Sequence, residues 1–98
     1  MSKQELIHLI QQQKAYLRRS FGFEHIFLFG SFATGRASTT SDIDVLVEVP
    51  RHAKTYQNYR GAKAFLKQLL NRNIDLVYAD SLNPVVRKEI QSEIIEIE

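Results

Sequence analysis

The sequence contains no cysteine and no apolar run approaching the roughly 18 residues that a membrane-spanning helix needs. Without cysteine, the chain can form neither a disulfide framework nor a thiolate metal site. The N-terminal segment also lacks the apolar stretch of a secretory signal, so we expect no signal peptide. These absences favour a cytoplasmic protein that does not engage a membrane.

A strong excess of charge of one sign is also missing. Lysine and arginine number 13 against 11 aspartates and glutamates, which leaves a net charge of +2. Such a balance gives no electrostatic reason to expect direct nucleic-acid binding. The basic stretch at 51–72 is most simply the solvent-facing side of a helix. A length of 98 residues fits one domain, which we expect to span residues 1–98.

Apolar periodicity predicts an alternation of helices and strands. Ser2 and Glu5 form a helix-start pattern, and apolar residues at helical spacing carry the first helix to about residue 19. Runs of strand-forming residues predict β-strands. The remaining expected elements are strands at 25–29, 43–49, 74–79 and 95–98, a helix at 55–70, a short helix starting at Pro84, and a loop at 30–41 with room for one helical turn.

This order of elements predicts an α+β fold, a small mixed β-sheet with helices packed on one face. In the strand at 43–49, odd-numbered β-branched residues share the buried face, whereas Asp42 and Asp44 project from the other. In the last helix we expect Val86 and Ile90 to be buried.

The segment after the first expected strand begins with Gly30 and Ser31. A glycine lets the backbone turn tightly, and successive N–H groups in such a turn can hold phosphate oxygens, with the Ser31 hydroxyl as a further donor. Asp42 and Asp44 lie two residues apart on a strand, so their like charges repel on one face, and a Mg²⁺ ion relieves that repulsion. Taken separately, a Gly-Ser pair is typical of a turn, and an Asp-x-Asp pair is typical of an exposed strand entry.

Asp75 is an acidic residue inside the otherwise apolar third strand. If the third strand lies beside the second, the Asp75 carboxylate can join those of Asp42 and Asp44. The alternative is a structural aspartate at a strand start, paired with Arg72.

In combination, these residues resemble a known signature. Residues 30–35 read GSFATG and, after five intervening residues, residues 41–44 read SDID. This is similar to the G-S-x-A-x-G…S-D-x-D pattern of the polymerase-β-like nucleotidyltransferase superfamily, in which Asp75 stands where a third carboxylate is found. The resemblance covers nearly the whole chain, and the short length points to the minimal nucleotidyltransferase (MNT) domains and their nucleotidyltransferase fold.

The resemblance implies a Mg²⁺-dependent enzyme with ATP as co-substrate. Asp42 and Asp44 would bind two Mg²⁺ ions, with Asp75 as a further metal ligand or general base. Gly30 and Ser31 would bind the β- and γ-phosphates of the nucleotide. The acceptor hydroxyl would attack the α-phosphorus, and pyrophosphate would leave.

One position departs from the common pattern of the MNT domains. Many of them carry arginine where this chain has Thr34, and we expect the neighbouring Arg36 to contact the phosphates instead. The three histidines have no metal-ligand spacing, so we interpret them as structural or surface residues. They are His8, His25 and His52.

The resemblance also implies a partner. MNT domains commonly occur as antitoxins of small HEPN-domain RNase toxins, and the implied reaction is AMP transfer from ATP to a tyrosine hydroxyl of the toxin. A second hypothesis is an antitoxin that binds and covers the toxin while its nucleotide site is vestigial. A third is nucleotidyl transfer to a small molecule, which we rank lower because such relatives usually carry an additional helical domain.

Overall fold

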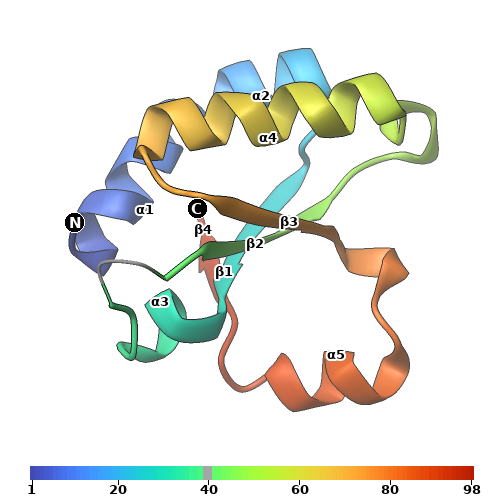
Figure 1. Ribbon diagram of the computed structural model, residues 1–98. Helices are drawn as coiled ribbons and strands as arrows, with labels where there is room; N and C mark the ends of the chain where they lie inside the picture. The colour runs from blue at the N-terminus through green and yellow to red at the C-terminus, as the bar shows by residue number, and fades with distance from the viewer. Residues whose placement is uncertain (39–40) are drawn as a thin grey trace.

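The structure, a computed structural model, describes residues 1–38 and 41–98 and is built on one β-sheet (Figure 1). The strands are β1 (His25–Phe29), β2 (Ile43–Glu48), β3 (Ile74–Tyr78) and β4 (Ile95–Ile97). They stand in the order β3-β2-β1-β4. β2 is parallel to β3, and β1 is antiparallel to both β2 and β4, so the predicted mixed sheet is confirmed.

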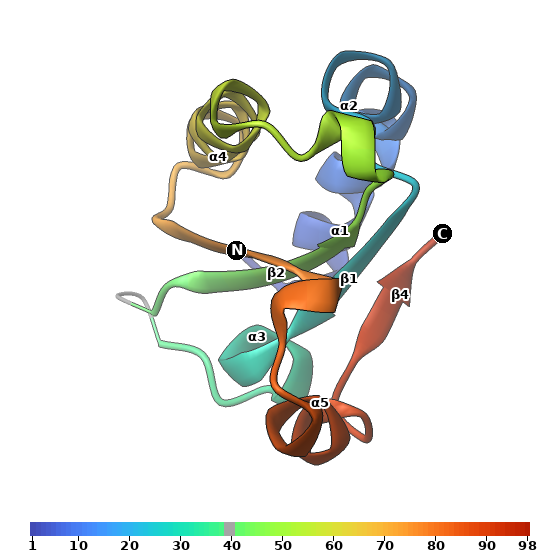
Figure 2. The ribbon, with the colours of Figure 1, turned by 90° about the vertical axis from the view of Figure 1, so that its right-hand side faces the viewer.

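Helices lie on both sides of this sheet, with the longer ones together on one face. The helices are α1 (Lys3–Gln12), α2 (Lys14–Phe21), α3 (Gly30–Thr34), α4 (Tyr56–Leu70) and α5 (Pro84–Ile90), with 3₁₀ turns η1 (Arg51–Ala53) and η2 (Ala79–Ser81). Figure 2 shows α1, α2 and α4 on one face, as predicted, and the shorter α3 and α5 on the other side. Across residues 1–38 and 41–98, no helix is long and apolar enough to cross a membrane.

The N-terminal helix is interrupted, which the sequence did not predict. The expected start is confirmed, because the Ser2 side chain accepts a hydrogen bond from the Glu5 N–H at 3.1 Å. The expected continuous helix to about residue 19 is wrong, because Gln13 leaves the helical conformation and separates α1 from α2. The apolar pattern conceals this break, since Ile10 and Leu17 stay at helical spacing across it and both are fully buried.

Strand β2 is the best-anchored part of the sheet. Ile43, Val45 and Val47 are fully buried against the long helices, as their alternation predicts. Leu46, on the opposite face, is also only 4% exposed. Each such burial contributes about 1.5–3 kcal/mol, so β2 is a rigid support for the acidic residue Asp44 that it carries.

Helix α5 packs more loosely than predicted. It begins at Pro84 with the Asn83 side chain accepting a hydrogen bond from the Val85 N–H at 2.7 Å, so its start is where the proline indicates. Val86, expected to be buried, is 39% exposed, and Ile90 is only partly buried. α5 has no fully buried residue, because it stands away from the open face of the sheet instead of lying on it.

Candidate active site

The two acidic strands bring their carboxylates together on the face opposite the long helices. The parallel register pairs Asp44 of β2 directly with Asp75 of β3. Asp42 stands two positions before Asp44 at the entry to β2, and its side chain is exposed, as is that of Asp75. The register therefore places Asp44 beside Asp75, and the charge of Asp42 also acts on Asp44.

Asp44 occupies the centre of this acidic cluster, defined here as Asp42, Asp44 and Asp75. Its pKa is raised from 3.8 to about 6, first by partial burial, then by the charge of Asp75 and hydrogen bonding with Asp75, and last by the charge of Asp42. Every contribution disfavours the ionised carboxylate. The cluster is thus a place where added positive charge is stabilising.

The donor set fits a hard divalent cation. Mg²⁺ uses oxygen ligands and takes only one or two carboxylates, completing its coordination with waters and substrate phosphates. Within residues 1–38 and 41–98, no group of three His, Cys, Asp or Glu side chains is spaced to hold one metal ion. One or two carboxylates, completed by waters and phosphate oxygens, are the ligands that Mg²⁺ takes beside a polyphosphate.

Gly30 lies against Asp44, and the packing there permits no side chain. The end of β1 pairs with Asp44 through Phe29, so the next residue starts α3 directly beside the Asp44 carboxylate. A Cβ on Gly30 would overlap Asp44 Oδ2 and stand 2.9 Å from its Cγ. Gly30 also has a φ of +73°, which L-residues with side chains rarely adopt. Both features couple the start of α3 to the acidic cluster.

Ser31 and Thr34 belong to α3, whereas Arg36 follows it. The Thr34 hydroxyl donates to the Gly30 carbonyl at 3.1 Å, and the Ser31 carbonyl accepts the Arg36 N–H at 2.8 Å. The Arg36 side chain donates from Nε to the Thr34 hydroxyl at 3.0 Å and lies 3.7 Å from the Glu93 carboxylate. Arg36 is thus held between α3 and the segment after α5, and Glu93 neutralises part of its charge.

Arg72 is a residue whose role the sequence analysis missed. It was considered only as a partner of Asp75, yet within the described parts of the chain no ion pair involves Asp75. Instead, Arg72 Nη2 donates to the carbonyls of Ser38 at 2.9 Å and Ser41 at 2.5 Å. Its guanidinium also lies over the Phe32 ring, 5.1 Å from the centroid. Arg72 thereby joins α3 to the residue immediately before Asp42.

Comparison with known proteins agrees with this geometry. A family model described as a nucleotidyltransferase domain matches residues 10–97. The protein adenylyltransferase MntA of Thermococcus cleftensis is 30% identical over 100 residues, covering 99% of this chain and 97% of that protein. A solved structure described as a minimal nucleotidyltransferase has a TM-score of 0.81 at 28% identity, over 97% of this chain and 95% of that one.

A further solved structure shares the fold. It is a complex of a tri-AMPylated HEPN toxin from Shewanella oneidensis with an MNT antitoxin, and one of its chains matches with a TM-score of 0.60 at 20% identity, over 94% of this chain and 71% of that one. The chain belongs to the nucleotidyltransferase domain family, and its fold is that of a minimal nucleotidyltransferase. The resemblance predicted from the GSFATG and SDID segments is confirmed.

Removing the Arg72 contacts is expected to impair nucleotidyl transfer more than folding. Arg72→Ala should lower kcat/KM at least about tenfold, because a hydrogen bond from a charged group contributes ~1.5–3 kcal/mol. Here these bonds fix the backbone just before Asp42. Arg72→Lys keeps the charge but not the planar fork, so its loss should be intermediate. Transfer rates per folded molecule, with thermal unfolding measured in parallel, check this. A destabilised Ala variant with full kcat would show that Arg72 acts on folding alone.

Proposed function

We propose that this protein is a protein adenylyltransferase that transfers AMP from ATP to a tyrosine hydroxyl of a HEPN-type RNase toxin, and thereby acts as its antitoxin in the cytoplasm. The observation that carries the proposal is the acidic cluster, with Asp44 paired to Asp75 in the sheet and in contact with Gly30. The relative MntA is a protein adenylyltransferase. The structural neighbour from Shewanella oneidensis holds an AMPylated HEPN toxin beside its MNT antitoxin.

The residues divide the proposed reaction among them. Asp42 and Asp44 would hold Mg²⁺, and the backbone at Gly30 and Ser31 would bind the β- and γ-phosphates. When bound, Mg²⁺ would supply positive charge that offsets the negative charge developing on the phosphates. Asp75 would accept the proton of the acceptor hydroxyl, while the oxygen of that hydroxyl forms a bond to the α-phosphorus. The bond from that phosphorus to the β-phosphate oxygen then breaks, and pyrophosphate leaves.

The acceptor would come from another molecule. Asp42 and Asp75 are exposed, so a hydroxyl on a second protein can approach the acidic cluster from solvent. A tyrosine hydroxyl suits an attack of this kind because the phenol projects beyond the backbone of its own chain. The rate would come mainly from holding this hydroxyl in line with the bond that breaks.

A specific contact favours one alternative, an antitoxin that acts by covering the toxin. Thr34 replaces an arginine that is common in this family, and Arg36, the expected substitute, is engaged by Thr34 and Glu93. A site that is short of one phosphate-binding cation would bind nucleotide more weakly. In that case neutralisation of the toxin would persist without any covalent change.

The experiment that separates the two functions measures whether the labelled nucleotide becomes attached to the partner protein. The protein is incubated with ATP labelled on the α-phosphate, Mg²⁺ and a HEPN-domain protein from the same organism, and the proteins are then examined for label. We expect label on the HEPN protein with wild type and none with the Asp42→Asn, Asp44→Asn double variant. If a stable complex forms but no nucleotide labels the partner, the covering function replaces our proposal.

A further inference from the structure

Two hollows lie beside helix α5, one at the end of β2 and one on the open face of the sheet. The smaller, of about 160 Å³, is lined by Val47, Glu48, Val49, Lys54, Ala79, Asp80 and Arg87. The larger, of about 450 Å³, lies between Phe27 of β1 and α5 and extends to Ile94. Arg87 lines both, so the two hollows adjoin at this side chain, and together they are named here the α5 groove.

Two residues of the α5 groove, Phe27 and Glu48, lie further along the strand face that carries Asp44. Phe27 pairs with Leu46, which is two positions beyond Asp44 on β2, and Glu48 is two positions further. Residues two apart on a strand share a face. At about 3.3 Å per residue, the four steps from Asp44 to Glu48 cover ~13 Å. A nucleotide whose α-phosphate lies at Asp44 therefore has its nucleoside within reach of this groove.

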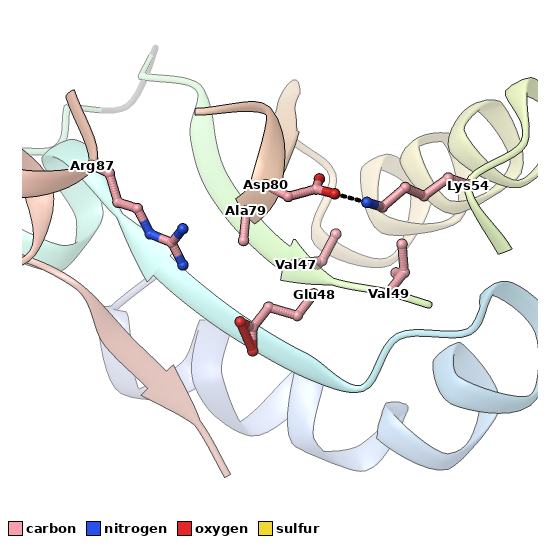
Figure 3. A pocket seen from close by; sticks show the side chains of 7 residues that line it. All are labelled: Val47, Glu48, Val49, Lys54, Ala79, Asp80 and Arg87. Carbon is pink, nitrogen blue, oxygen red and sulfur yellow. Dashed lines mark ion pairs between the residues drawn. The ribbon is translucent and has the colours of Figure 1, made fainter. Parts of the chain in front are cut away.

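Two charged side chains in the groove have no partner among the residues that the structure describes. Lys54 and Asp80 form an ion pair with each other. By contrast, within residues 1–38 and 41–98 the side chains of Glu48 and Arg87 take part in no ion pair or hydrogen bond. Figure 3 shows them extending from β2 and α5 toward the same space. An unpaired acceptor and an unpaired planar cation above an apolar floor are groups that a ligand can engage.

We propose that the α5 groove binds the nucleoside part of the donor nucleotide, with Glu48 accepting hydrogen bonds from its N–H or O–H groups and Arg87 lying against the base. This inference rests on the proposed nucleotidyl transfer and specifies the part of the substrate that the acidic cluster does not contact. A guanidinium packs well on a planar aromatic face, and Phe27 and Ile94 offer apolar surface beside it. The acceptor protein would then approach from the exposed side of Asp75.

The test compares ATP with inorganic tripolyphosphate, which lacks the nucleoside. Binding of each in the presence of Mg²⁺ is measured by calorimetry for wild type, Glu48→Gln, Arg87→Ala and the control Lys67→Ala, which alters an exposed lysine of α4 across the sheet. We expect Glu48→Gln and Arg87→Ala to weaken ATP binding at least about tenfold without a comparable loss of tripolyphosphate binding. Removing the negative charge of Glu48 would by itself strengthen the binding of a polyanion, so weaker ATP binding indicates a direct contact.

Other results overturn the inference in distinguishable ways. Equal weakening of both ligands by Arg87→Ala would make Arg87 a phosphate-binding residue. Unchanged ATP affinity together with a raised KM for the acceptor protein would assign the α5 groove to the acceptor. Variants that match wild type in both would leave the groove without a role in nucleotide binding while transfer stands. A wild-type protein that binds no ATP would overturn the nucleotidyl-transfer proposal as well.

Discussion

Asp44→Asn is expected to lower the rate of nucleotidyl transfer roughly 10³-fold or more. In the absence of metal, the folded variant should nevertheless be more stable than wild type. The loss follows because a metal-bound site supplies several kcal/mol of charge stabilisation, and each 1.4 kcal/mol is tenfold in rate. The gain follows because partial burial, and after it the neighbouring carboxylates, disfavour the ionised form of Asp44 and raise its pKa to about 6. Replacing it with a neutral amide removes both penalties.

The direction of the pH dependence follows from the raised pKa. The folded protein binds a proton at Asp44 more tightly than the unfolded chain, whose aspartate has a pKa near 3.8. The corresponding stabilisation is complete below pH 3.8 and is lost as the pH rises through about 6. The melting temperature of Asp44→Asn should therefore exceed that of the metal-free wild type above pH 6, on the order of a few degrees.

Thermal unfolding from pH 4 to 8, with and without Mg²⁺, checks this prediction. Mg²⁺ should raise the melting temperature of wild type and have little effect on Asp44→Asn. Glu24→Gln, which neutralises an exposed acid before β1 and away from the cluster, is the control and should track wild type. If Asp44→Asn melts below wild type at pH 7 without metal, the inferred cost of ionising Asp44 in the folded protein is absent.

Gly30→Ala is expected to reduce transfer by about 10²-fold or more, because the new Cβ would displace the Asp44 carboxylate. A displacement of about 1 Å at a reacting group costs on that order. The positive φ of Gly30 adds backbone strain of ~1–3 kcal/mol. Both activity and stability should therefore fall.

Gly35 offers a matched control for the strain. It has a similar φ of +78°, but a Cβ there would meet nothing within 4 Å. Gly35→Ala should thus lose a comparable amount of stability while keeping most of its activity. Steady-state transfer assays and chemical denaturation on both variants make the comparison. Equal losses of activity would mean that backbone strain, and not the contact with Asp44, makes glycine necessary at position 30.

Much of the fold could be predicted from local patterns. Strand-forming runs marked the four strands, and the alternation of Ile43, Val45 and Val47 identified the buried face. The end of the first helical segment could not be predicted, because its apolar spacing continues through the break at Gln13. The exposure of Val86 on α5 was missed for a related reason, since periodicity shows which side of a helix is apolar but not whether the sheet reaches it.

The sequence by itself determined the acidic pair, because two aspartates two residues apart on a strand must share a face. The register of β2 with β3 decided that Asp75 joins them, and it depends on hydrogen bonding between strands far apart in the chain. Tertiary packing likewise decided that Arg72 hydrogen-bonds to the backbone before Asp42 and that Arg36 pairs with Glu93. It also left Glu48 and Arg87 facing an open groove. A local pattern sets the direction of a side chain, whereas only the folded chain sets which distant group that side chain meets.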